Sequence, residues 1–331
     1  MLNAMTAPYA PTVLTEGDAA HAVSGLSRRP LLLAGLGAAT ISSSAVLIAL
    51  SAASAVSTAF YRSLLALPVL IILAALEQRR RGPRPLAQRL RAVTAGVFLA
   101  VDLILWAHAI TDVGAGVATV LGNLQVLFVA GIAWLFWRER PNRAVAMALP
   151  VVMLGVVLVS GLVGRTTAGH HPLAGVGYGI GTSIAYAGFL LILRRSSSGM
   201  AHVAGPVADA TAGLAFASLA FGLVFGGLAL HPIWPAVGWL ALLALLSQTA
   251  GWLLITSSLP RLPAAVSSLL LLLQPAAALG LAAVILGQRP TLPQILGAVL
   301  TCGGALGASL AATATPPAPC RATSRSGPAP R

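Results

Sequence analysis

Hydrophobic residues gather in ten runs along the chain, each long enough to cross a lipid bilayer. A helix needs about 20 apolar residues to span the hydrocarbon core, and only helices or closed barrels satisfy the backbone there. The runs are continuous rather than alternating, which favours helices. They occupy approximately residues 31–50, 56–76, 91–110, 114–137, 143–163, 173–193, 207–230, 236–257, 264–287 and 294–312. The pattern predicts an all-α polytopic membrane protein with ten transmembrane helices.

One stretch of the chain occurs twice. The segment AGVATVLGNLQVLFVAGIAWLFWRERP (residues 115–141) aligns without a gap with AAVSSLLLLLQPAAALGLAAVILGQRP (residues 264–290), at an offset of 149 positions (264 − 115 = 149). Gln125 thereby matches Gln274, and a glycine and the final Arg-Pro pair match as well. Apolar matches carry little weight in Ala/Leu-rich segments, whereas these specific matches at one offset indicate a duplicated membrane unit.

Each unit holds five runs, an odd number, so the second unit enters the membrane in the opposite sense to the first. We expect a first five-helix repeat at residues 31–163, a linker loop at 164–172 and a second five-helix repeat at 173–312. Residues 1–30 and 313–331 are rich in small residues and proline and are expected to be disordered tails. Inverted repeats are typical of secondary transporters, whose two halves expose a central site to each side in turn.

The distribution of arginines predicts how the protein is oriented in the membrane. All 20 basic residues are arginine. The side of the membrane on which the chain begins receives 17 of them, namely Arg28, Arg29, Arg79, Arg80, Arg81, Arg84, Arg89, Arg91, Arg138, Arg140, Arg143, Arg194, Arg195, Arg261, Arg321, Arg325 and Arg331. The opposite side receives only Arg165 and Arg289. Because basic loops stay in the cytoplasm, we expect both termini inside and the protein in the cytoplasmic membrane. The pair Arg28-Arg29 also resembles an export signal, but nine further runs favour a retained anchor.

Composition excludes the soluble classes. The chain of 331 residues is 57% hydrophobic and 8% charged, with a mean hydropathy of +0.90, whereas about a quarter of the residues in soluble domains are charged. A net charge of +13 would suggest nucleic acid in a soluble protein, but topology accounts for it here, and no nucleic-acid partner is expected. Cys302 and Cys320 form neither a disulfide framework nor a metal site, and no cofactor is expected.

Asp102 is the clearest candidate functional residue. It lies about midway along the third run, with apolar residues on both sides, and ionisable groups inside a bilayer are functional candidates by default. Phe98, Asp102 and Trp106 are spaced four residues apart and share one helix face. The Asp102 carboxyl could bind a proton in one conformation and release it in another, which would couple transport to protons. The alternative is a structural carboxylate bonded to a hydroxyl or to Arg62.

The other candidates are polar or aromatic residues expected at mid-depth near the repeat interface. Gln125 and Gln274 are equivalent positions, and amides at this depth find partners either on neighbouring helices or on substrate. Pro275 removes a backbone donor and disfavours helix at the residue before it, so it is a candidate gating hinge. His108 is a second proton-relay candidate, with packing as its alternative. The candidate substrate-binding residues are Asp102, Trp106, Asn123, Gln125, Tyr186, Gln248, Trp252 and Gln274.

Three segments resemble the EamA-type drug/metabolite transporter family of ten-span bacterial carriers. AFYRSLLALPVL (residues 59–70) is similar to that family's Phe-Tyr-Arg-Phe element, LAVDLILWAHAITDVGAGVAT (99–119) to its aromatic third span, and WRERP (137–141) to its Gly-Glu-Arg turn. The resemblance covers about residues 31–312. It implies export, or sometimes import, of small metabolites such as amino acids, often coupled to protons.

Together these features predict a secondary active transporter of small metabolites that works by alternating access. We expect an exporter of amino-acid-like or amphipathic substrates, with protons as the candidate coupling ion. A membrane-embedded enzyme and a non-transporting membrane scaffold are the alternatives. The sequence holds no P-loop, HExxH or Asp-rich diphosphate motif, so we expect neither ATP drive nor enzymatic activity. The expected partners are a small-molecule substrate and the lipid bilayer, and a homodimer is left open.

Overall fold

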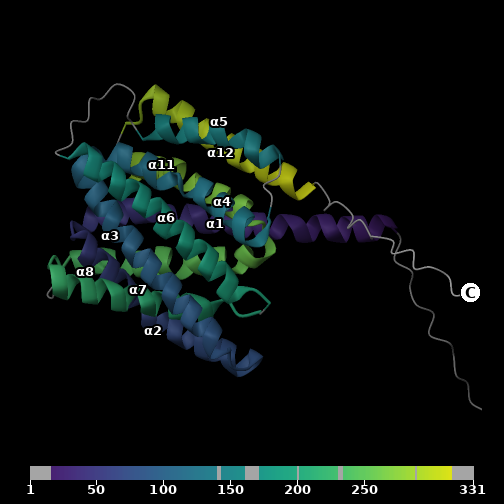
Figure 1. The fold of residues 1–331 in the computed structure, drawn as a ribbon, viewed down its shortest axis with the longest axis horizontal. Coiled ribbons are helices and arrows are strands. Elements are labelled where there is room, and N and C mark those ends of the chain that lie inside the picture. The colour runs from purple at the N-terminus through teal and green to yellow at the C-terminus, as the bar shows by residue number, and fades with distance from the viewer. Residues whose placement is uncertain are drawn as a thin grey trace, which may run out of the picture.

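The structure, a computed structural model, describes residues 16–139, 143–160, 171–199, 201–229, 234–287 and 289–314. Within these residues the chain is all-helical and contains no strand (Figure 1). The same residues include nine helices that are long and apolar enough to cross a membrane, and the shorter apolar helix Arg143–Val159 accounts for the remaining predicted span. The predicted all-α membrane fold is confirmed.

The helices follow the order of the predicted spans. The first half contains α1 (Glu16–Ser51), α2 (Ala55–Arg81), α3 (Leu86–Asn123), α4 (Gln125–Trp137) and α5 (Arg143–Val159). The second half contains α6 (Pro172–Ser197), α7 (Ala204–Phe225), α8 (Ala236–Leu243), the π-helical segment η1 (Ala244–Gly251), α9 (Trp252–Ser258), the 3-10 turn η2 (Leu259–Arg261), α10 (Ala264–Leu271), α11 (Leu273–Ile285) and α12 (Leu292–Ala314).

Helix α1 begins earlier than predicted. It starts at Glu16, inside the segment expected to be a tail, and its first turns extend beyond the bundle (Figure 1). Residues 1–15 and 315–331 lie outside the described part of the chain.

The chain turns back on itself within α3. In a straight helix, Trp106 and Gly122 would lie about 24 Å apart, at a rise of 1.5 Å per residue. In the structure, a Cβ atom on Gly122 would lie 3.8 Å from Trp106 Cδ1, so the two parts of α3 lie side by side. The third and fourth spans are accordingly Leu86–Val113 and Val117–Trp137.

Capping side chains and a glycine set both ends of α2 and the start of α7. The Ser54 hydroxyl accepts a hydrogen bond from Ser57 N at 3.2 Å and caps the start of α2. Gly82, with φ of 81°, ends it. At the start of α7, the Glu77 carboxylate accepts hydrogen bonds from Val203 N at 2.7 Å and Gly205 N at 2.9 Å. A side chain of α2 thus caps the first turn of its partner helix.

Equivalent helices of the two halves pack antiparallel to each other. The start of α2 meets the end of α7, since a Cβ on Gly222 would lie 3.0 Å from Val56 Cγ1. The end of α2 meets the start of α7 through the Glu77 cap described above. Helices α5 and α12 pair in the same way, with Gly155 against Thr301 and Gly304 against Val152. These antiparallel pairs are the inverted repeat.

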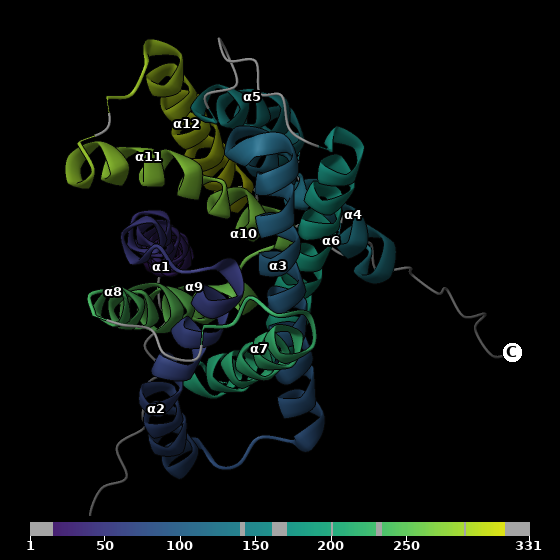
Figure 2. The same cartoon turned by 90° about the vertical axis from the view of Figure 1, so that its left-hand side faces the viewer.

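The two halves interlock rather than forming separate domains. Helix α1 of the first half packs between α8 and α11 of the second half, as its end-on view in Figure 2 shows. Helix α6 of the second half packs in turn against α3 and α4 of the first half. The residue ranges of the repeats therefore describe the duplication in the sequence, whereas the folded core is shared by both copies.

Candidate functional site

A cavity of about 270 Å³ lies where the two halves meet. We call it the central cavity. Its walls come from α1, α2, α3, α4, α6, α9, α10 and α11, so each half contributes to it. Seven of the eight candidate substrate-binding residues line it: Asp102, Trp106, Asn123, Gln125, Tyr186, Trp252 and Gln274. Pro275, the candidate hinge, lines it as well.

Two candidates lie elsewhere. Gln248 is only 2% exposed, and its Nε2 donates to Thr211 Oγ1 at 3.0 Å instead of facing the central cavity. His108 is exposed, and its ring lies 5.3 Å from the Tyr178 ring between centroids. His108 therefore lies outside the lining of the central cavity, and Gln248 lies in a contact between helices.

The central cavity holds one acidic and one basic side chain, both buried. Asp102 and Arg62 are each 6% exposed and line the same space. Arg62 Nη2 donates to Ser247 Oγ at 3.0 Å, and that oxygen lies 2.7 Å from Ser44 Oγ. These contacts join α2, η1 and α1. Arg62 therefore belongs to the polar wall of the cavity.

Two residues that line the central cavity carry buried polar atoms without hydrogen-bond partners. Arg62 Nε and Gln125 Oε1 are buried and form no hydrogen bond within the described residues. A buried polar group costs free energy when it lacks a partner. Arg62 and Gln125 both line the central cavity, so the wall of the cavity includes residues whose polar groups are not fully satisfied within the described protein.

An aromatic cluster forms the apolar part of the cavity wall. The rings of Phe189 and Trp252 meet edge to face, with centroids 4.7 Å apart and planes at 86°. Tyr186 lies 5.8 Å from Phe189 and 6.4 Å from Trp252, between centroids. Trp252 and Tyr186 line the central cavity, as Trp106 does. The cavity therefore combines an apolar aromatic wall with a pair of opposite charges, as expected of a site for small amphipathic molecules.

Two helices break beside the central cavity. Helix α3 ends at Asn123 and α4 begins at Gln125, while α10 ends at Leu271 and α11 begins at Leu273. Each break is a single tight turn, with Leu124 N bonded to Leu121 O and Leu272 N to Leu269 O, both at 3.1 Å. Broken helices at mid-depth are typical of transporter binding sites, because their freed backbone groups are tolerated only beside protein or a cavity.

The two breaks have different causes. Near the second break, Pro275 lacks the amide that would bond to the carbonyl of Leu271. The first break has no proline. Instead, the Ser183 hydroxyl donates to the carbonyls of Leu121 and Gly122, the latter at 3.0 Å. A hydroxyl from α6 thus adds a hydrogen bond to the backbone oxygens at the break, a role that the sequence alone did not reveal.

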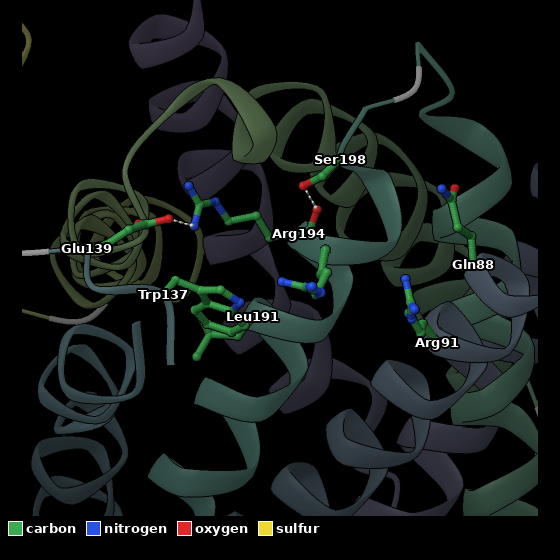
Figure 3. A pocket seen from close by; sticks show the side chains of 8 residues that line it. Gln88, Arg91, Trp137, Glu139, Leu191, Arg194 and Ser198 are labelled. Atoms are coloured by element: carbon green, nitrogen blue, oxygen red, sulfur yellow. Dashed lines mark hydrogen bonds and ion pairs between the residues drawn. The ribbon is translucent and has the colours of Figure 1, made fainter. Parts of the chain in front are cut away.

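A polar cluster closes the protein on the side where α4 and α6 end. Arg194 Nη1 lies 2.8 Å from Glu139 Oε1, and Arg194 Nε donates to Leu259 O at 3.2 Å. The other oxygen of Glu139 accepts from Ala264 N at 3.3 Å. These contacts, which we call the Glu139 closure, tie α4 and α6 to η2 and α10. Figure 3 shows the ion pair between Glu139 and Arg194.

The Glu139 closure lies on the arginine-rich face, the side on which α2, α4 and α6 end and α3 begins. On this face Asp209 pairs with Arg84 and, at 3.6 Å, with Arg89. The central cavity extends toward the opposite face, because Ile48 lies near the far end of α1. The described structure is therefore closed at the arginine-rich face.

Comparisons with known proteins agree with this architecture. Residues 29–161 and 173–310 each match the EamA-like transporter family. No curated protein sequence matches the chain. Among solved structures, 29 chains match. One of them, described only as "Crystal structure of protein", has a TM-score of 0.71 and 14% identity, and covers 86% of this chain and 97% of its own. That likeness shows a shared fold. The family match spans both repeats, and the chain therefore belongs to the EamA-like transporter family.

Proposed function

We propose that this protein is a secondary carrier that exports small amino-acid-like or amphipathic metabolites by alternating access, with protons as the coupling ion. The observation that carries the proposal is the central cavity, which both inverted halves build and which extends away from the face held by the Glu139 closure. Such a site can open to the other face when the halves exchange conformations.

The chemistry of the central cavity favours a small substrate that carries charge. Its volume of about 270 Å³ lies just below the range for drug-sized ligand sites, about 300–1,000 Å³, which favours a small molecule. Arg62 offers a positive charge to an anionic group, and Asp102 offers a carboxylate to a cationic one. The wall of Tyr186 and Trp252 suits an apolar side chain. A zwitterion with a hydrophobic substituent, such as an amino acid, complements all three features.

The arginine-rich face is the cytoplasmic face in this proposal, and both termini are cytoplasmic. The support is the distribution of arginines over the connections between spans. In this orientation the described conformation is open toward the outside, and the Glu139 closure seals the cytoplasmic side.

Transport by reconstituted protein tests the function. In proteoliposomes, a labelled amino acid should show saturable counterflow, in which unlabelled substrate on one side drives labelled substrate from the other. Chemical conversion of the substrate without net movement would instead support a membrane-embedded enzyme. The absence of flux and of conversion across a broad panel of metabolites would support a non-transporting scaffold. A comparison of metabolites inside and outside cells, with and without the protein, selects the panel.

The Glu139 closure is expected to set the balance between the two conformations. By the offset of 149 positions, Glu139 corresponds to Gln288 (139 + 149 = 288) and Arg194 to Ala45 (194 − 149 = 45). The opposite face thus has no equivalent ion pair. Glu139→Gln should shift the protein toward the conformation open to the cytoplasm by up to about fivefold, since a partly exposed ion pair contributes about 1 kcal/mol or less.

The shift can be measured with a cysteine placed in the central cavity, Ala278→Cys. Its labelling by a thiol reagent from the cytoplasmic side should increase in Glu139→Gln. The reversed pair Glu139→Arg with Arg194→Glu is the control, because it retains opposite charges and should partly restore the original balance. An unchanged accessibility in Glu139→Gln would show that the ion pair does not control the closure.

A further inference from the structure

A groove with one polar and one apolar half runs along the arginine-rich face, between α3, α6 and the end of α4. The polar half has a volume of about 390 Å³ and is lined by Gln88, Arg91, Trp137, Glu139, Leu191, Arg194, Arg195 and Ser198 (Figure 3). The adjoining half has a volume of about 450 Å³ and adds Ala87, Leu90, Thr94 and Ile192, while sharing Arg91, Trp137, Leu191 and Arg195. We call the two halves together the α3–α6 groove.

The polar half carries excess positive charge. Three arginines and one glutamate line it, and Glu139 is neutralised by Arg194 at 2.8 Å. Arg91 forms no ion pair with an acidic residue within the described chain, and the contact of Arg195 is the face of the Trp137 ring, 5.7 Å from its centroid. Two guanidinium groups, Arg91 and Arg195, therefore remain available to an anion. Arginine binds phosphate well, because its planar fork donates two parallel hydrogen bonds.

The other half of the groove is apolar and open to the bilayer. Leu90 is 57% exposed, whereas Leu191 is buried at its floor. The groove lies within the first turns of the span that begins at Leu86 and the last turns of the span that ends at Ser197, which is the depth of lipid headgroups. Trp137, in the last turn of α4, is the residue type that marks this interface.

We propose that the α3–α6 groove binds a glycerophospholipid with a net negative headgroup, drawn from the leaflet on the arginine-rich side. The phosphate lies between Arg91 and Arg195, and an acyl chain follows Leu90 and Leu191 along the membrane surface of the protein. Charge complementarity selects the headgroup, since basic pockets between transmembrane helices bind anionic lipids. The apolar half selects a lipid over a free anion. This site is separate from the central cavity and goes beyond the transport function.

Native mass spectrometry of the full-length protein tests the proposal. The protein is released from vesicles of phosphatidylcholine that contain phosphatidylglycerol as the minor component, and the retained lipids are counted. The wild type should retain phosphatidylglycerol in preference to phosphatidylcholine. The variant with Arg91→Gln and Arg195→Gln should retain about tenfold less phosphatidylglycerol or lower still, because both arginines that line the groove and would contact the phosphate are lost.

A matched control removes the same charge from the same face. Arg79 and Arg80 are exposed at the end of α2 and do not line the groove. The variant with Arg79→Gln and Arg80→Gln should stay within about twofold of the wild type. An equal loss in this control would show diffuse attraction instead of a site. Equal retention of both lipids by the wild type would likewise overturn the proposal.

Thr94→Trp tests the apolar half without changing charge. The indole should fill the space beside Leu90 and lower the retention of phosphatidylglycerol, and this variant carries the test if the arginine double variant does not fold. Unchanged retention in Thr94→Trp would show that the acyl chain lies elsewhere. Displacement of phosphatidylglycerol by inorganic phosphate alone would identify a simple anion site. Unchanged retention in Thr94→Trp and displacement by phosphate would each overturn the assignment of a lipid.

Discussion

Asp102→Asn is expected to abolish uptake driven by a pH gradient while leaving substrate exchange partly intact. Asparagine has nearly the same shape as aspartate but cannot take up and release a proton. Asp102 is buried, lines the central cavity and shares it with Arg62, so its protonation can change the charge that the substrate meets. We expect gradient-driven uptake in proteoliposomes to fall by about tenfold or more, whereas counterflow without a gradient persists.

Asp209→Asn is the matched control for this experiment. It makes the same chemical change at a carboxylate that pairs with Arg84 on the arginine-rich face, away from the central cavity. The control should keep its gradient dependence. If Asp102→Asn also kept the gradient dependence of the wild type, Asp102 would not be the proton site, and its role would be structural.

Gly96→Ala is expected to destabilise the protein strongly. A Cβ at position 96 would overlap the carbonyl oxygen of Ala210 and lie 2.7 Å from Leu214 N. Both are backbone atoms of α7, so no rotation of a side chain can relieve the overlap, and α3 must move away from α7. Overpacking of this kind costs typically 1–3 kcal/mol and sometimes more. The expected result is a lower melting temperature of the purified protein in detergent.

Gly131→Ala gives the opposite expectation. Gly131 lies in α4, and a Cβ there would meet nothing within 4 Å. Alanine in the interior of a helix is favoured over glycine by about 1 kcal/mol, so this variant should be as stable as the wild type or more stable. The two substitutions are chemically identical, and a similar loss of stability in both would contradict the close contact between α3 and α7.

The spans could be predicted from the sequence because bilayer thickness and backbone hydrogen bonding leave few alternatives for long apolar runs. The duplication then placed Gln125 and Gln274 together, because equivalent positions of inverted repeats meet at the repeat interface. The match to the EamA-like transporter family over both repeats confirms this architecture. Periodicity also placed Asp102 and Trp106 on one helix face, and both line the central cavity.

Features that depend on departures from regular helix geometry could not be predicted. Gln248 was expected on the substrate face, but it lies in the π-helical segment η1, whose wider turn changes the direction of the side chains. The break after Asn123 has no proline to signal it, since its carbonyls are bound by Ser183 from a helix that is distant in the sequence. The pairing of Glu139 with Arg194 could not be predicted for another reason: it joins residues of different halves, and their contact depends on how the two halves interlock.

The accessibility of Ala278→Cys tests alternating access most directly. Ala278 lines the central cavity, and cysteine is a small change there. In a background without Cys302 and Cys320, a membrane-impermeant thiol reagent should label this cysteine from the outside. It should also label it from the cytoplasmic side in inverted vesicles, at a rate that substrate changes. Val299→Cys, on the exposed surface of α12, should stay unlabelled from both sides. Labelling of Ala278→Cys from one side only, under every condition, would contradict the carrier mechanism.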